Sequence, residues 1–154
     1  MPQPPDDLLI RPATPDDDPT VVTRITAGRA GWEHLNAEIR GLSVGQTWSS
    51  KTGDHEAALV VLGGRCGVTS DRGEWSDVGR RPDVFSGMPY ALYLPRATAF
   101  TVTARTERLE LAHCWVPTDE DHPARLVTPA DVEIEIRGGG HCTRQKVNHT
   151  TLPR

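Results

Sequence analysis

A run of apolar residues between a carboxylate and two glycines constrains the fold of this chain more than any other segment. It begins at Glu56, continues as Ala-Ala-Leu-Val-Val-Leu and ends at Gly63-Gly64. A short apolar run bounded by turn residues is typical of a strand that is buried on both faces. Further segments with strand character lie at 90–94, 100–104 and 109–116. No segment shows a sustained helical period, so the sequence predicts an all-β protein.

Two other segments have an apolar residue at every second position, 35–39 and 132–136. Because successive side chains of a strand point to opposite faces, each segment is expected to bury its apolar face and to expose its polar face. The sequence Asp71-Arg-Gly73-Glu is a hairpin signal. Many short strands with turns between them predict a closed barrel or a two-sheet jelly roll.

The spacing of four residues narrows the choice of barrel. Gly45 is followed by Glu56, then by Gly63, and later by Pro95 before a further strand. This order resembles that of cupins, so we predict a cupin-type double-stranded β-helix, a jelly-roll barrel, over residues 21–136. The Pro- and Asp-rich residues 1–20 are expected to be extended, and residues 137–154 to form a basic, Gly-rich tail that begins an inter-domain connection.

Composition excludes several classes of protein. The 154 residues are enough for one domain with a real core, and no apolar run approaches the length of a membrane helix. The net charge of −4 argues against nucleic acid as a partner. Three cysteines without paired spacing and the lack of a signal-peptide pattern predict a cytoplasmic protein.

Several phrases, taken together and in order, resemble the first half of the 5-deoxy-glucuronate isomerases. They are Ala30-Gly-Trp-Glu33, Thr52-Gly-Asp-His-Glu56, Val84-Phe-Ser-Gly-Met-Pro-Tyr-Ala-Leu-Tyr-Leu-Pro95, Leu109-Glu-Leu-Ala112, Arg125-Leu-Val-Thr-Pro-Ala-Asp-Val132, Glu135-Ile-Arg-Gly-Gly-Gly140 and Thr143-Arg-Gln145. The resemblance implies a two-cupin enzyme of myo-inositol catabolism that interconverts the aldose and ketose forms of a deoxy-uronic acid. It also implies that zinc is bound in the second cupin, so no cofactor is expected in this chain.

The residues at the cupin ligand positions agree with that expectation. The motif places two histidines shortly before Glu56, where this chain has Ser49-Ser50-Lys51-Thr52. It places a third histidine five residues after Pro95, where the chain has Phe100. Imidazole and carboxylate groups are the ligands that such a metal needs. We therefore expect no metal here, and we expect Glu56 to form hydrogen bonds inside the mouth of the barrel.

Three residues are candidates for substrate binding: Glu56, His113 and Arg144. His113 shares a strand face with Leu109 and Leu111, which predicts a hydrogen-bonded interior position. Arg144 has the side chain that pairs best with the carboxylate of a uronate, but a solvated basic tail is the favoured explanation of its position. His55 is expected to be an exposed turn residue.

Two functions are compatible with these observations. The first is that of the metal-free cupin half of a 5-deoxy-glucuronate isomerase, inactive alone. The alternative is a non-enzymatic cupin used for sugar-acid binding or assembly. A third possibility, an isomerase that uses Glu56 and His113 without metal, requires both side chains in one pocket. In each case we expect a homo-oligomer, most simply a homodimer, because an isolated cupin half exposes surface that a partner would cover.

Overall fold

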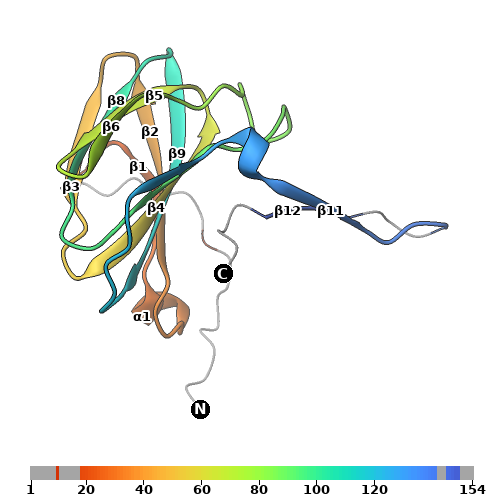
Figure 1. Ribbon diagram of the computed structural model, residues 1–154, viewed down its shortest axis with the longest axis horizontal. Helices are drawn as coiled ribbons and strands as arrows, with labels where there is room; N and C mark the ends of the chain where they lie inside the picture. Colours follow the sequence, from red (N-terminus) through yellow and green to blue (C-terminus); the bar gives the residue numbers. More distant parts are fainter. Residues whose placement is uncertain (1–9, 11–17, 142–144, 150–154) are drawn as a thin grey trace.

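The computed structural model describes residues 10, 18–141 and 145–149, and their strands build a barrel from two facing sheets (Figure 1). The larger sheet has six strands, in the order β1 (Val21–Ile25), β2 (Asn36–Ser43), β9 (Arg108–Pro117), β4 (His55–Gly63), β7 (Ala91–Leu94) and β10 (Arg125–Val127). The smaller sheet has four strands, in the order β3 (Thr47–Lys51), β8 (Ala99–Ala104), β5 (Cys66–Ser70) and β6 (Gly73–Val78). The all-β prediction is confirmed.

Short helices and tight turns connect these strands. The helix α1 (Ala27–Ala30) follows β1, and a 3-10 turn η1 (Pro129–Asp131) follows β10. The predicted hairpin is present, because β5 and β6 pair antiparallel and Ser70 lies opposite Gly73. No helix in the described ranges has the length and the hydrophobicity to cross a bilayer.

The core lies between the two sheets and is built by alternation along the strands. In β4, Ala57, Leu59 and Val61 are buried, whereas the residues between them are only partly covered. The run that begins at Glu56 is therefore buried completely on one face only. The largest fully buried aliphatic side chains include Leu59, Leu92, Leu94, Leu109 and Leu111. Trp48 and Phe100 meet edge to face with their ring centroids 5.2 Å apart.

The face that β2 turns to the core differs from the prediction. The alternation predicted that Ala37 and Ile39 are buried, but the buried residues are Glu38, Arg40 and Leu42. The prediction was wrong because it assumed that charged side chains face water. Pairing with β9 sets Glu38 opposite His113, and the charged groups satisfy one another inside the barrel.

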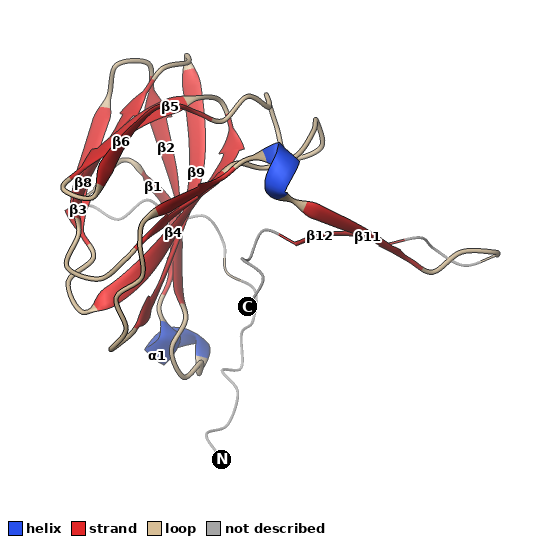
Figure 2. Ribbon diagram, viewed as in Figure 1, coloured by secondary structure: helices blue, strands red, loops and turns tan. Residues whose placement is uncertain are grey.

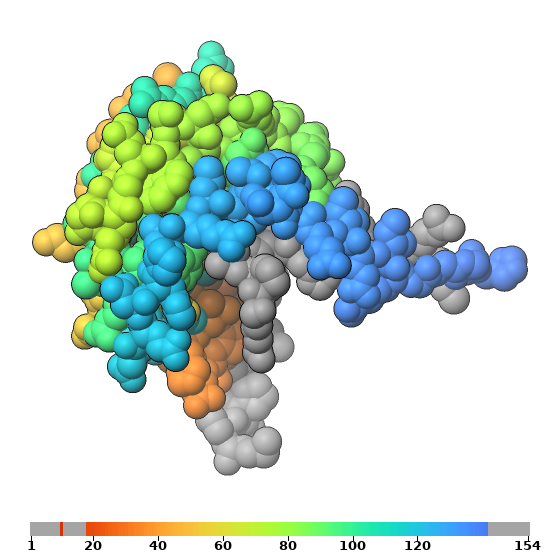
Figure 3. Space-filling view, viewed as in Figure 1, coloured from red at the N-terminus to blue at the C-terminus, as the bar shows by residue number. Residues whose placement is uncertain are grey.

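A second departure concerns the end of the chain. The strand β11 (Glu133–Arg137) is present as predicted, but it pairs with β12 (Gln145–His149), within the segment expected to be a tail. This hairpin extends away from the barrel in Figure 2, and the space-filling view in Figure 3 shows the same for β11. Ile134 and Ile136, expected to be buried, are 49% and 66% exposed, so β11 does not bury its apolar face within the described part of the chain. The domain boundaries at residues 20 and 136 remain predictions.

Candidate functional site

A cavity of about 360 Å³ lies at one end of the barrel, between the two sheets. We call it the mouth cavity. Its polar and aromatic lining includes Arg24, Glu38, Arg40, His55, His113 and Trp115. They come from β1, β2, β4 and β9, whose inward positions meet at this end. A volume of this size lies within the range of small-molecule sites.

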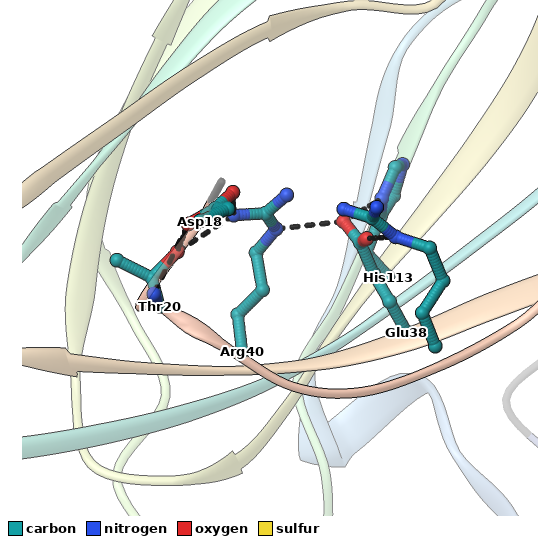
Figure 4. Close-up of polar contacts among 6 residues, drawn as sticks. Asp18, Thr20, Glu38, Arg40 and His113 are labelled. Atoms are coloured by element: carbon teal, nitrogen blue, oxygen red, sulfur yellow. Dashed lines mark hydrogen bonds and ion pairs between the residues drawn. The ribbon is translucent and has the colours of Figure 1, made fainter. Parts of the chain in front are cut away.

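Glu38 is the centre of a buried charge network in this cavity. Its Oε1 atom accepts a hydrogen bond from Arg40 Nε at 2.6 Å and lies 3.0 Å from His113 Nδ1 (Figure 4). Its Oε2 atom accepts a hydrogen bond from Arg24 Nε at 2.8 Å. The side chains of Glu38 and Arg40 are almost fully buried, at 3% and 5% exposure. Both carboxylate oxygens of Glu38 are thus occupied by nitrogen donors.

The network continues from Arg40 to the segment before β1. Arg40 Nη1 donates to Asp18 Oδ2 and to Thr20 Oγ1, both at 2.7 Å. The hydroxyl of Thr20 donates in turn to Asp18 Oδ1 at 2.6 Å. Buried charges persist only when they are paired in this way. Among the described residues, no buried side-chain nitrogen or oxygen lacks a hydrogen-bond partner.

These contacts keep the carboxylates ionised. Burial raises the pKa of Glu38, but the hydrogen bonds from His113, Arg24 and Arg40 outweigh it and lower the pKa to about 2. Burial also opposes ionisation of Asp18, and its hydrogen bonds with Thr20 and Arg40 lower the pKa below its usual range. Glu38 therefore stays an anion at neutral pH and is unsuited to proton transfer.

Aromatic rings form the wall around this network. The Arg40 guanidinium lies 4.0 Å from the centroid of the Trp48 ring, a cation–π contact. His113 stacks on Trp115 with 4.6 Å between the ring centroids and an interplanar angle of 21°. Each of these rings packs against another member of the network, and these contacts shape the wall of the cavity.

His113 occupies the interior, hydrogen-bonded position that the alternation of β9 predicts. Because Glu38 is ionised, Nδ1 of His113 carries the proton and donates to it. This arrangement leaves Nε2 as the acceptor when the ring is neutral. His55, expected to be an exposed turn residue, is instead half-buried at the first position of β4 and lines the mouth cavity.

Glu56 does not lie inside the barrel, so that prediction was wrong. Ala57 and Leu59 point inward, and the alternation of the strand therefore turns Glu56 to the outer face of the larger sheet. There its Oε2 atom accepts a hydrogen bond from the Tyr93 hydroxyl at 2.8 Å. Burial and this hydrogen bond raise the pKa of Tyr93 well above its usual value.

The outward position of Glu56 also removes one of the three functions considered. Glu56 lines a small apolar pocket on the outer face, whereas His113 lines the mouth cavity. A metal-free isomerase that needs both side chains in one pocket is therefore contradicted. The third candidate, Arg144, lies outside the described residues.

The side chains inside the barrel do not fit a zinc ion. Phe100, at a cupin ligand position, is 3% exposed and packs in the core. Glu38, the one buried carboxylate near His113, is already bound by two guanidinium groups. Across the described ranges, no three His, Cys, Asp or Glu residues are placed to hold a metal ion. We therefore derive no step of a reaction through a metal bound to this chain.

Sequence reasoning did not find Arg24, Glu38 and Arg40. One signal was available, because Glu38 and Arg40 are two residues apart on a strand and must share a face. Two opposite charges on one face can satisfy each other, which makes burial possible. Arg24 gave no comparable signal, since its position opposite Glu38 depends on the pairing of β1 with β2.

Comparisons with known proteins agree with this architecture. An IolB-like protein from Salmonella typhimurium LT2 has a similar structure, with a TM-score of 0.80 and 30% identity over 85% of this chain and 49% of the other. A mutant of oxalate decarboxylase from Bacillus subtilis matches with a TM-score of 0.51 at 18% identity, over 64% of this chain and 26% of the other, a likeness of fold alone. The predicted cupin-type fold is confirmed.

Two similar sequences carry the same name. Proteins called 5-deoxy-glucuronate isomerase from Geobacillus thermodenitrificans and Geobacillus kaustophilus are 38% and 37% identical over 147 residues, 95% of this chain. The chain spans about half of these relatives, 52% of their length. The model of the KduI/IolB family matches residues 8–153. This chain belongs to the KduI/IolB family.

Proposed function

We propose that this chain is one cupin half of a 5-deoxy-glucuronate isomerase, the half that resembles the first domain of the longer relatives. The observation that carries the proposal is the family match over residues 8–153, together with relatives of that name that are about twice as long as the matched region. The reaction converts an aldose form of a deoxy-uronic acid into its ketose form, as a step of myo-inositol catabolism.

An aldose–ketose isomerisation moves a proton from C2 to C1 while the carbonyl group moves from C1 to C2. It needs a group that removes the C2 proton and groups that stabilise the negative charge on the oxygens. In the mouth cavity Glu38 is locked as an anion by Arg24 and Arg40, and no zinc site fits. We therefore place the proton-transfer groups and the zinc in the other cupin half.

The test is an exchange of halves. The half of the Geobacillus thermodenitrificans relative that this chain matches is replaced by this chain, and the fusion is assayed with 5-deoxy-glucuronate beside the intact relative. The fusion is expected to turn over the substrate, and this chain alone, with zinc or manganese added, is expected to stay at the metal-only background. An inactive but folded fusion would overturn the proposal, and so would activity of the chain alone.

We also propose that the protein is cytoplasmic, binds no nucleic acid and forms a homo-oligomer. Exposed apolar side chains support the last point, since Phe85 is 95% and Ile136 is 66% exposed. Sedimentation at micromolar concentration is expected to give at least twice the chain mass, and a mass near 16.9 kDa would contradict it. A purely non-enzymatic binding or assembly cupin is the alternative, and the family match does not favour it.

A further inference from the structure

We infer that the mouth cavity is itself a binding site for a uronic acid, in which Arg24 pairs with the carboxylate and His113 accepts a hydrogen bond from a ring hydroxyl. The choice of a uronic acid rests on the proposed function. The existence of a site for a hydroxylated carboxylate rests on the charges, the donors and the shape of the cavity.

The charges favour an anion. The cavity lining contains three cationic side chains, Arg24, Arg40 and Lys51, against one carboxylate, Glu38. Asp18 balances part of this charge through its ion pair with Arg40 at 2.7 Å. One positive charge is left over, and a single carboxylate matches it.

Arg24 is the residue best placed to meet that carboxylate. Its Nε atom binds Glu38 at 2.8 Å, and within the described part of the chain its two terminal nitrogens have no ion-pair partner. The side chain is 35% exposed and lines the cavity, so a ligand can reach it. A guanidinium group with two free terminal nitrogens can bind a carboxylate through two parallel hydrogen bonds. Glu38 holds the group in place for this contact.

His113 supplies the complementary acceptor. Its Nδ1 atom is held by Glu38 at 3.0 Å, which leaves the Nε2 lone pair for a hydroxyl hydrogen. The ring packs against both Trp48 and Trp115, with centroid distances of 5.1 Å and 4.6 Å. Trp115 also lines the cavity and contributes apolar surface that the carbon atoms of a sugar can contact. The cavity thus combines a cation, an acceptor and an aromatic wall, the groups that a uronic acid requires.

The experiment is a titration of the full chain with D-glucuronate, followed by calorimetry and by tryptophan fluorescence, with D-glucose as the ligand that lacks the carboxylate. Saturable binding is expected for D-glucuronate and not for D-glucose. Arg24→Gln is expected to weaken binding by at least about tenfold, the size of a lost charged contact. Arg24→Lys keeps the charge but loses the planar fork. Its affinity for D-glucuronate is expected to lie between those of the parent chain and Arg24→Gln.

Arg96→Gln is the matched control. Arg96 has a similar exposure of 30% and a single ion pair, with Asp54 at 3.1 Å, but it does not line the cavity. Its affinity for D-glucuronate is expected to equal that of the parent chain. Circular dichroism and melting curves confirm that each variant is folded. If Arg24→Gln does not fold, the folded Arg24→Lys variant carries the test, with weaker binding than the parent expected.

Three results would overturn the inference: no saturable binding of D-glucuronate, equal binding of D-glucose, or equal losses in the Arg24 and Arg96 variants. These binding results are independent of the exchange of halves, because that experiment measures turnover by the fusion. An active fusion with no D-glucuronate binding by this chain refutes the inference alone. An inactive fusion with binding refutes the proposed function alone.

Discussion

The two ends of the barrel both carry arginines, but they hold them in different ways. At the mouth cavity, Arg40 is 5% exposed and makes ion pairs of 2.6 and 2.7 Å with Glu38 and Asp18. The strand β4 begins there and runs to the other end, where loops surround an open cleft of about 1000 Å³. We call it the arginine cleft. The arginines that line it are Arg65, Arg80, Arg81, Arg105 and Arg108.

At the arginine cleft the charges are loosely paired. Arg65 is 50% and Arg80 is 72% exposed, and they share Asp77 at 3.7 and 3.6 Å. Water solvates such groups, so their pairing contributes little to stability. At the mouth cavity the side chains of Glu38 and Arg40 are almost fully buried, so each of these charges depends on its partner. The same residue type is therefore part of the folded core at one end and a surface group at the other.

Removal of the central carboxylate tests this difference with the largest expected effect. Glu38→Gln leaves Arg24 and Arg40 without their buried anion, and we expect the free energy of unfolding to fall by about 3–5 kcal/mol. Urea denaturation measures the change. Glu110→Gln is the control, since Glu110 is 38% exposed and pairs with the exposed Arg108 beside the arginine cleft. A loss there of about 1 kcal/mol or less is expected. Similar losses in both variants would contradict the comparison.

The loops around the arginine cleft are held by close backbone packing. We therefore expect a glycine in these loops to contribute more to stability than the charged side chains of the cleft. Gly64 has a φ of +91°, and a Cβ atom would lie 2.4 Å from the Arg108 carbonyl oxygen. We expect Gly64→Ala to lower the free energy of unfolding by about 3 kcal/mol, through strain and collision. Gly28→Ala, in α1 with nothing within 4 Å of the new atom, is expected to have no destabilising effect. If Gly64→Ala is as stable as the parent, packing does not hold this end together.

The sequence predicts the buried face of a strand well or badly according to what that strand packs against. Alternation placed Leu109, Leu111 and His113 on the inner face of β9 correctly, because apolar residues mark that face. The same rule failed for β2, where Glu38 and Arg40 take the inner positions. Polarity indicates which face of a strand is exposed only where a buried polar side chain would find no partner. Here Glu38 and Arg40 find partners on other segments of the chain, so they can be buried.

The other failures have related causes. The spacing around Glu56 identified the barrel, but the orientation of Glu56 follows from which residues of β4 fill the core. The strand β11 shows alternation without burial, since Ile134 and Ile136 stay exposed among the residues that the structure describes. The local sequence pattern predicts a strand. Whether the strand is buried depends on the element that packs against it, and the local pattern does not identify that element.

Acid should weaken the mouth cavity selectively. The pKa of Glu38 is lowered from 4.5 to about 2 in the folded protein, so the unfolded chain binds the proton first as the pH falls. The stability that this ionised group contributes is present above about pH 4.5 and is lost as the pH falls toward 2. From pH 6 to pH 3 we expect a loss of about 2 kcal/mol from Glu38, measured by urea denaturation at each pH. Glu110→Gln should keep this loss, whereas Glu38→Gln should lack it, because the titrating group is gone. An unchanged acid slope in Glu38→Gln would show that the arginines of the mouth cavity do not depend on this carboxylate.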